Sequence, residues 1–154
     1  MNIRALLYAS LLFTAASSCR AETLQQQMLY YLTQPSAMAC ASHLVSKEAG
    51  AEKKNAQEGV LSVALYRAVT QKKPLCSVIK AKGQYSWMKK GYNFNKRTEH
   101  FSEQVVLDFL FKLVHNKPVL VATHHHDVSI TNPWPSMRFV GQRGKIKYYL
   151  EKGL

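Results

Sequence analysis

Acidic residues are scarce in this sequence. Aspartate and glutamate together number 9, against 21 lysines and arginines, which gives a formal net charge of +12 at pH 7. The basic residues are spread along the chain in small groups, from Lys53-Lys54 to the group between Lys145 and Lys147. A positive field of this kind attracts polyanions and speeds encounter with them. The same charge also fits a well-solvated surface that serves only solubility.

Long apolar runs are also missing, apart from one at the start of the chain. Residues 5–16 are almost continuously apolar, and small residues follow them up to Ala21. A bilayer-spanning helix needs about 20 apolar residues, so this pattern predicts a secretory signal peptide over residues 1–21. We expect cleavage after Ala21; an uncleaved membrane anchor and lipid attachment at Cys19 are the alternatives. Residues 22–154 would then form one domain with its own core and no membrane span.

Export limits the choice of partner. An exported protein rarely meets nucleic acid, and the chain would keep a charge of about +10 after the signal peptide is removed. We therefore expect a periplasmic or secreted monomer that meets anionic polymers of the cell envelope. Peptidoglycan, lipopolysaccharide and teichoic acid belong to this class.

Cysteine is rare as well. Of the three cysteines, Cys19 lies in the expected signal peptide, which leaves Cys40 and Cys76. An even pair in an oxidising compartment predicts one disulfide, which would stabilise the fold by about 3–4 kcal/mol. Two buried free thiols are the alternative interpretation.

Several catalytic motifs are absent. The sequence has no His-Glu-x-x-His, no paired Cys-x-x-Cys and no Gly-x-Ser-x-Gly elbow, which argues against the common zinc hydrolases and serine hydrolases. The run from His124 to His126 still allows a metal site, because His124 and His126 would share one face of a strand. A third ligand would have to come from His43, His100, His115 or Asp127. We favour substrate contact or a hydrogen-bonded cluster, and expect no metal and no cofactor.

Apolar spacing predicts a mainly helical chain. Helices are expected over residues 23–34, 36–48, 55–71 and 100–116, with a helical turn over 74–80 and a polar, aromatic loop over 81–98. Ser36 and Asn55 are the expected N-caps of the second and third helices. Extended segments are expected over 119–123 and 145–149, on either side of a Pro-rich loop over 132–135. The fold class is therefore α+β, predominantly α, with a small β element in a single domain.

One carboxylate stands out in the second predicted helix. At about 100° per residue, Glu48 shares a face with the apolar residues Ala41 and Leu44, whereas Ser42 and His43 fall on the opposite side. A glutamate in line with a core usually lies on the wall of a cleft. Desolvation on such a wall raises the pKa of a carboxyl group, which can then act as a general acid near neutral pH. Alternatively, the helix ends here and Glu48 turns to water.

Short patches between residues 40 and 149 occur in a characteristic order. They are Cys40-Ala41 with Glu48-Ala49, Gln57 to Arg67, Pro74-Leu75-Cys76, Gln84-Tyr85-Ser86-Trp87, Thr123-His124-His125-His126, Asn132-Pro133-Trp134, and Gly144-Lys145 with Tyr148-Tyr149. In this order and spacing the chain resembles the SleB/CwlJ-type cell-wall hydrolase family. It departs from the family pattern at Gly50-Ala51, Tyr66 and Ile146, where the family has Arg-Gly, Asn and His. These changes affect the expected substrate contacts and leave Glu48 in place.

The resemblance implies a lysozyme-like, lytic-transglycosylase-type domain that cleaves the glycan strands of peptidoglycan. It places Glu48 in the role of general acid and base, in a phage or prophage endolysin or a bacterial wall-remodelling enzyme. A muramidase-type hydrolase would ordinarily need a second carboxylate, for which Glu52 is the nearest candidate. A lytic transglycosylase needs only one, and we favour that route.

The remaining candidate residues would contact the glycan. Aromatic rings can cover the apolar face of a sugar, and Gln or His side chains can bond its hydroxyl and acetamido groups. The stacking candidates are Tyr85, Trp87 and Trp134, and the hydrogen-bonding candidates are Gln57, Gln84, His124 and His126. Two other functions stay open: a catalytically inert, basic envelope-binding protein, and a metal-dependent peptidoglycan amidase built on the histidines.

Overall fold

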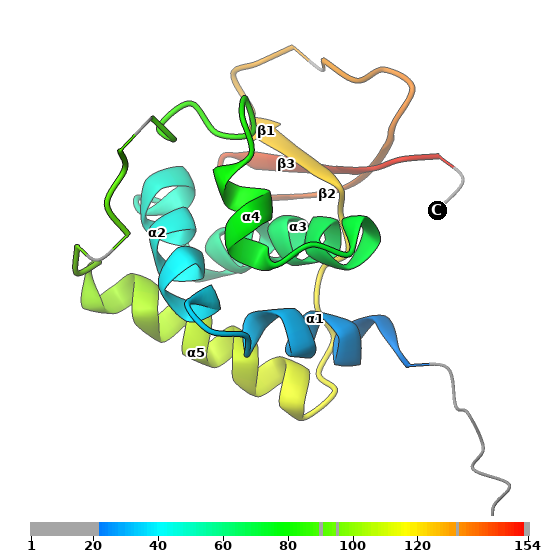
Figure 1. Ribbon diagram of the computed structural model, residues 1–154. Coiled ribbons are helices and arrows are strands. Elements are labelled where there is room, and N and C mark those ends of the chain that lie inside the picture. Colours follow the sequence, from blue (N-terminus) through cyan, green and yellow to red (C-terminus); the bar gives the residue numbers. More distant parts are fainter. Residues whose placement is uncertain (1–21, 90, 95, 132, 153–154) are drawn as a thin grey trace, which may run out of the picture.

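A computed structural model describes residues 22–152 except 90, 95 and 132, so the expected signal peptide lies outside the described residues. The described residues contain five helices and three strands. In chain order they are α1 (Leu24–Leu32), α2 (Ala37–Ala49), α3 (Lys54–Gln71), α4 (Leu75–Lys80), α5 (His100–Val114), β1 (His124–Asp127), β2 (Arg138–Arg143) and β3 (Ile146–Leu150). Figure 1 shows α3 in the middle, with the sheet on one side and α1 and α5 on the other. The class is α+β and predominantly α, as the sequence predicts.

The helix starts follow local hydrogen bonding. Thr23 begins α1 with a capping box, in which its side chain accepts from the Gln26 N–H and the Gln26 side chain accepts from the Thr23 N–H. Ser36 is the N-cap of α2, as expected, although its side chain makes no capping bond. The expected cap at Asn55 is wrong: the Lys53 carbonyl already accepts from two following N–H groups, so α3 begins at Lys54.

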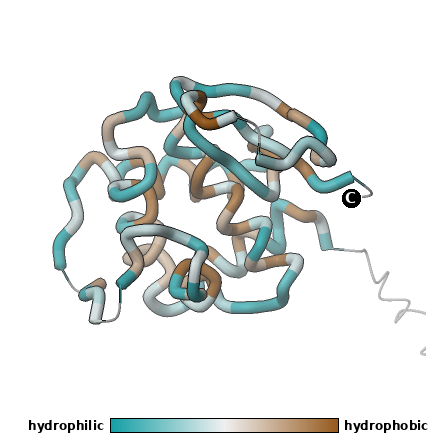
Figure 2. Tube along the Cα trace, turned by 90° about the horizontal axis from the view of Figure 1, so that it is seen from above, coloured by the Kyte–Doolittle hydropathy of each residue, from teal (hydrophilic) through white to brown (hydrophobic). Residues whose placement is uncertain are grey.

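The core surrounds α3. This helix is buried on nearly all sides along most of its length, and its inward residues include Leu61, Ala64, Leu65 and Ala68, as predicted. A helix that is covered all round lies inside a domain rather than on its surface. In Figure 2 the hydrophobic residues accordingly gather toward the middle of the trace, whereas the periphery is mostly hydrophilic.

The opposite side of α2 is also buried, contrary to expectation. Ser42 and His43 are about as buried as the core residues, because the loop over residues 81–98 folds back across this side of the helix. The Nε2–H of His43 donates to the Phe94 carbonyl at 2.9 Å, and its Nδ1 accepts from the Tyr92 hydroxyl at 2.9 Å. The sequence pattern placed these polar residues opposite the apolar face of the helix and could not show which loop covers that side.

The sheet differs most from the sequence prediction. It is antiparallel with the strand order β1-β3-β2, and β3 lies close to the expected segment 145–149. The expected extended segment over 119–123 is not itself a strand of the sheet. It crosses α3, where the Ser62 hydroxyl donates to the Leu120 carbonyl, and the paired strand begins at His124. Strand β2 was not anticipated, since an irregularity in its register between Phe139 and Gly141 breaks the alternation that identifies a strand.

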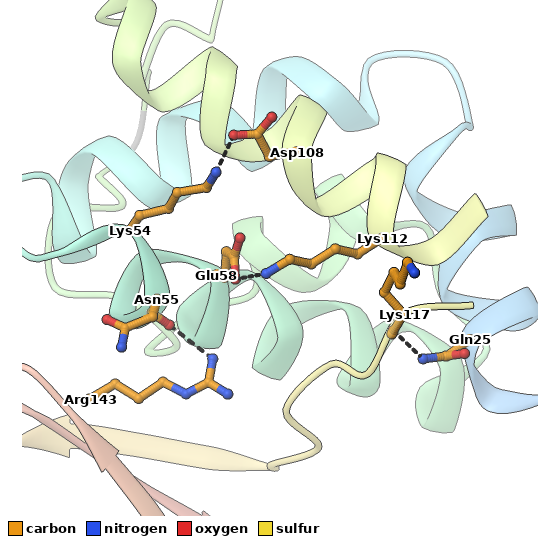
Figure 3. Close-up of polar contacts among 8 residues, drawn as sticks. All are labelled: Gln25, Lys54, Asn55, Glu58, Asp108, Lys112, Lys117 and Arg143. Atoms are coloured by element: carbon orange, nitrogen blue, oxygen red, sulfur yellow. Dashed lines mark hydrogen bonds and ion pairs between the residues drawn. The ribbon is translucent and has the colours of Figure 1, made fainter. Parts of the chain in front are cut away.

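Helix α5 is fastened to α3 by two ion pairs. Lys54 pairs with Asp108, and Lys112 Nζ lies 2.6 Å from Glu58 Oε2 (Figure 3). The charged groups of α5 in these pairs therefore point toward α3 rather than away from the protein. Among the described residues, no helix combines the length and the apolarity that a membrane span requires.

Gly59 sits in the middle of α3 because a tyrosine of the sheet packs against it. A Cβ at this position would lie 2.5 Å from the Tyr148 hydroxyl oxygen, and that hydroxyl donates to the Ala56 carbonyl at 2.7 Å. Helix propensity alone favours alanine over glycine by about 1 kcal/mol. The close approach of the sheet therefore explains a residue that is otherwise unfavourable in a helix.

Gly59→Ala is expected to lower the free energy of unfolding by about 1–2 kcal/mol, because the added methyl must displace a buried tyrosine that is hydrogen-bonded in place. Guanidinium denaturation measures this difference. The matched control is Gly141→Ala in β2, where a Cβ would meet no atom within 4 Å. A Gly59→Ala protein as stable as the parent would contradict this account of the contact.

Candidate functional site

A disulfide fixes the helix that carries Glu48. It joins Cys40 of α2 to Cys76 of α4, as expected, over a sequence separation of 36 residues. Helix α4 leads directly into the loop over residues 81–98. The bond therefore ties α2 to the segment that supplies the aromatic and amide side chains of the site.

Glu48 lies in a hollow of about 280 Å³. The residues that line it are Glu48, Arg67, Gly83, Gln84, Tyr85, His124, His125 and Trp134. Five of the residues predicted for the site, from α2, the aromatic loop, β1 and the Pro-rich loop, thus meet in one place. The side chain of Glu48 is 21% exposed, so it lies on the wall of the hollow, as predicted, and does not turn freely to water.

Two side chains contact the two oxygens of the Glu48 carboxylate. The indole Nε1–H of Trp87 donates to Oε1 at 2.5 Å, and Nε2 of His125 lies 3.6 Å from Oε2. The Trp87 hydrogen bond orients the carboxylate, and the His125 ring lies beside its second oxygen at a distance longer than a hydrogen bond. Trp87 was predicted for the site as a stacking surface. In the structure its indole N–H instead donates a hydrogen bond to the Glu48 carboxylate.

The ring of Tyr85 is largely covered. It stacks on Trp87 with the ring centroids 5.8 Å apart, and burial raises the pKa of its hydroxyl to about 12. The hydroxyl oxygen is buried and has no hydrogen-bond partner within the part of the chain that the structure describes. Trp87 occupies one face of the ring, and Tyr85 still lines the hollow, so its stacking on a sugar stays a prediction. Trp134 is less buried, lines the hollow and remains the better stacking candidate.

Arg67 links three parts of the site. Its Nε–H donates to the Thr123 carbonyl at 2.8 Å, and a terminal N–H donates to Gln84 Oε1 at 2.6 Å. Arg67, Gln84 and His124 also line a second hollow of about 350 Å³ that adjoins the first. Arg67 was not among the residues predicted for the site. The sequence signal that could have identified it is a single arginine near the end of an otherwise apolar helix.

The three consecutive histidines separate into two groups. His124 and His126 share one face of β1, as predicted, and both lie against Trp134, with ring centroids 4.8 and 5.7 Å away. Burial, assisted by the nearby Arg67, lowers the pKa of His124 and keeps its ring neutral near pH 7. The side chain of His125 points to the other face, toward Glu48 and Tyr148.

His126 does not line the hollow, so its predicted contact with substrate is wrong. It is buried, its Nδ1–H donates to the Asp127 carbonyl at 2.6 Å, and its Nε2 accepts from the Tyr149 hydroxyl at 3.0 Å. Both ring nitrogens are therefore used inside the sheet. His125, which was not among the predicted site residues, is the histidine that lies beside Glu48. Strand alternation predicts this division once the strand is known to begin at His124.

Gln57 is also a structural residue rather than a substrate contact. Its side chain is 0% exposed, and its amide donates to the Ala49 carbonyl at 2.9 Å. This bond satisfies a carbonyl at the last turn of α2, next to Glu48. A fully buried side chain cannot reach a glycan, so the expected hydrogen bond to substrate is wrong, and Gln57 acts by holding the end of the helix.

Glu52 lies away from the Glu48 hollow. Its Oε2 accepts from the backbone N–H of Lys145 at 3.0 Å, in the turn between β2 and β3. It therefore fastens the loop between α2 and α3 to the sheet and is not among the residues that line the hollow. This contact does not support the prediction that Glu52 is the second carboxylate of a hydrolase.

Other parts of the described chain offer no comparable arrangement. No group of three or more His, Cys, Asp or Glu side chains in residues 22–152 comes together as a metal site, within the limits of what the structure describes. Another hollow, of about 470 Å³, lies on the other side of α2, between Met38 and Leu107. It contains none of the residues predicted for catalysis.

No protein-family model matches this chain, and neither the curated proteins nor the solved structures contain a significant match.

Proposed function

We propose that this protein cleaves the glycan strands of peptidoglycan, with Glu48 as general acid and base on a lysozyme-like domain. One observation carries the proposal. The partly buried carboxylate of Glu48 accepts a hydrogen bond from Trp87 and has His125 beside it, on the wall of a hollow lined by polar and aromatic side chains. A carboxyl group in such a place is suited to protonate a glycosidic oxygen.

The proposed reaction needs two proton transfers. The Glu48 carboxyl donates its proton to the glycosidic oxygen as the bond to the anomeric carbon breaks. The resulting carboxylate then takes the proton from the hydroxymethyl group of the same muramic acid, whose oxygen closes an anhydro ring on the anomeric carbon. Glu48 ends the cycle protonated again, so no second acid or base is required.

The carboxylates of the site favour this route over hydrolysis. A retaining hydrolase places a second carboxylate about 5–5.5 Å from the acid, and an inverting one places it about 6.5–9.5 Å away. Glu48 is the only carboxylate among the described residues that line its own hollow. Glu151 lines only the adjoining one, and Glu52 is bonded to the backbone of Lys145. A lytic transglycosylase is therefore our first choice and a muramidase-type hydrolase our second.

The surroundings of Glu48 suit an extended polar polymer. The two adjoining hollows share Gln84 and His124, which can bond hydroxyl and acetamido groups of a sugar. Trp134 lines the hollow that contains Glu48. The net charge of about +10 that is expected after removal of the signal peptide would draw the protein to the anionic envelope. An exported enzyme, of phage, prophage or bacterial origin, would meet its substrate there. The rival functions are an inert envelope-binding protein and a metal-dependent amidase.

Mass spectrometry of digested peptidoglycan distinguishes these functions. We expect anhydro-muropeptides from the wild-type protein, with activity that survives prolonged incubation in chelator. Reducing ends would indicate a hydrolase instead, and free stem peptides together with loss of activity in chelator would indicate an amidase. Binding to the wall without any released product would leave the envelope-binding function.

A further inference from the structure

The outer face of α5 carries an apolar stripe. Leu107, Phe111 and Val114 follow one another at spacings of four and three residues and are 49%, 58% and 53% exposed. This spacing places the three side chains side by side along one face of the helix. Single exposed apolar residues are common on proteins, but a continuous row along a helix is a typical contact surface.

The stripe is free of formal charge. The exposed polar residues beside it on α5 include His100 and Gln104, and none of the exposed residues of this helix is Asp, Glu, Lys or Arg. Asp108 and Lys112 of the same helix are directed at α3, where Lys54 and Glu58 neutralise them (Figure 3). In a chain with a net charge of +12, an uncharged row on an exposed helix is unexpected for a surface that faces only water.

The stripe continues into the hollow of about 470 Å³ through Leu107. Met38, Ala39 and Phe94 supply its apolar walls, and the exposed cations Lys96 and Arg97 also line it. Apolar side chains with cations beside them form the pattern that interfacial membrane-binding helices present to anionic lipids. Two acids lie nearby. Glu103 is half-buried and accepts from the Thr98 hydroxyl, and Glu99 is the exposed N-cap residue of the helix, with no capping bond from its side chain.

We propose that the outer face of α5, with the adjoining hollow, binds the surface of a bilayer that contains anionic lipids. Leu107, Phe111 and Val114 would enter the interface, while Lys96 and Arg97 would contact the phosphates. A second copy of this chain fits the face less well, because pairing two such faces brings cations toward cations. This inference is independent of the proposed glycan cleavage, since the hollow of Glu48 lies on the other side of α2.

Co-sedimentation of the exported, processed protein with lipid vesicles tests this proposal. We expect binding to vesicles of mixed phosphatidylglycerol and phosphatidylcholine, and much weaker binding to phosphatidylcholine alone. The double variant Leu107→Ser/Phe111→Ser should reduce the partition into anionic vesicles about tenfold, because the apolar contact is lost and the charge is kept. Excess inorganic phosphate should not compete, because the lipid supplies both the phosphate and the apolar surface.

The matched control is Phe139→Ser, which removes a 55% exposed aromatic ring from β2 and should bind like the wild type. Circular dichroism checks that each variant is folded. Equal binding of the double variant and the wild type would overturn the proposal, as would absence of binding to either vesicle. A dimer in size-exclusion chromatography that Leu107→Ser/Phe111→Ser dissociates would assign the face to a second copy instead.

Discussion

Glu48→Gln is expected to abolish the turnover of purified peptidoglycan while leaving the fold intact. Glutamine keeps the size of the side chain, and its amide oxygen can still accept from the Trp87 indole N–H. It has no proton to give to a glycosidic oxygen. Loss of general acid catalysis commonly costs about 10²–10⁴-fold in rate. We expect a loss at or above the top of this range, because the same carboxyl group performs both proton transfers in the proposed reaction.

Loss of turbidity of a peptidoglycan suspension measures this effect, and circular dichroism confirms that the variant is folded. The matched control is Glu52→Gln, which changes a carboxylate in the same region that does not line the hollow. It should lower activity far less than Glu48→Gln if Glu48 acts alone, and by a similar factor if Glu52 supplies a second carboxylate. A folded Glu48→Gln protein that clears the wall at the wild-type rate would refute the assignment and favour charge-driven envelope binding.

Removal of the disulfide is expected to lower the free energy of unfolding by about 3–4 kcal/mol. The bond closes a loop with a sequence separation of 36 residues, and the chain-entropy model assigns a stabilisation of this size to such a loop. The variant Cys40→Ala/Cys76→Ser suits the buried and the half-exposed end of the bond. Activity should fall with stability, because Cys40 and Glu48 lie on the same helix.

Guanidinium denaturation of the double variant and of the reduced wild type measures this stabilisation. Thiol labelling of the denatured, unreduced wild type gives a direct control, since neither cysteine should react. Two reactive thiols after removal of the signal peptide, or equal denaturation midpoints for the double variant and the oxidised wild type, would contradict the prediction.

The helical part of the fold follows from the sequence because its signals are local. Apolar spacing and stop residues predict the main helices to within a few residues, and the same spacing directs Glu48 along an apolar face. The even pair of cysteines likewise predicts one bond. These features depend on residues that are neighbours along the chain or, for the disulfide, on the lack of any other partner.

The sheet and the covered faces depend on contacts between distant segments. The strand that begins at His124 is four residues long and pairs with a segment more than twenty residues later, so its start cannot be read locally. Burial of His43 likewise requires the aromatic loop to fold across α2. Strand alternation by itself separates His125 from His124 and His126, but only the packing of the sheet shows that the His125 side meets Glu48.

The sequence by itself determined which helix carries the candidate acid, where most helices lie and which cysteines pair. Only the tertiary structure decided how that acid is held and which candidates stand beside it. Three predicted site residues are instead hydrogen-bonded to other parts of the fold: Gln57, Glu52 and His126. Residue type and spacing indicate which chemistry a side chain can perform. Its packing partners decide whether a substrate can reach it.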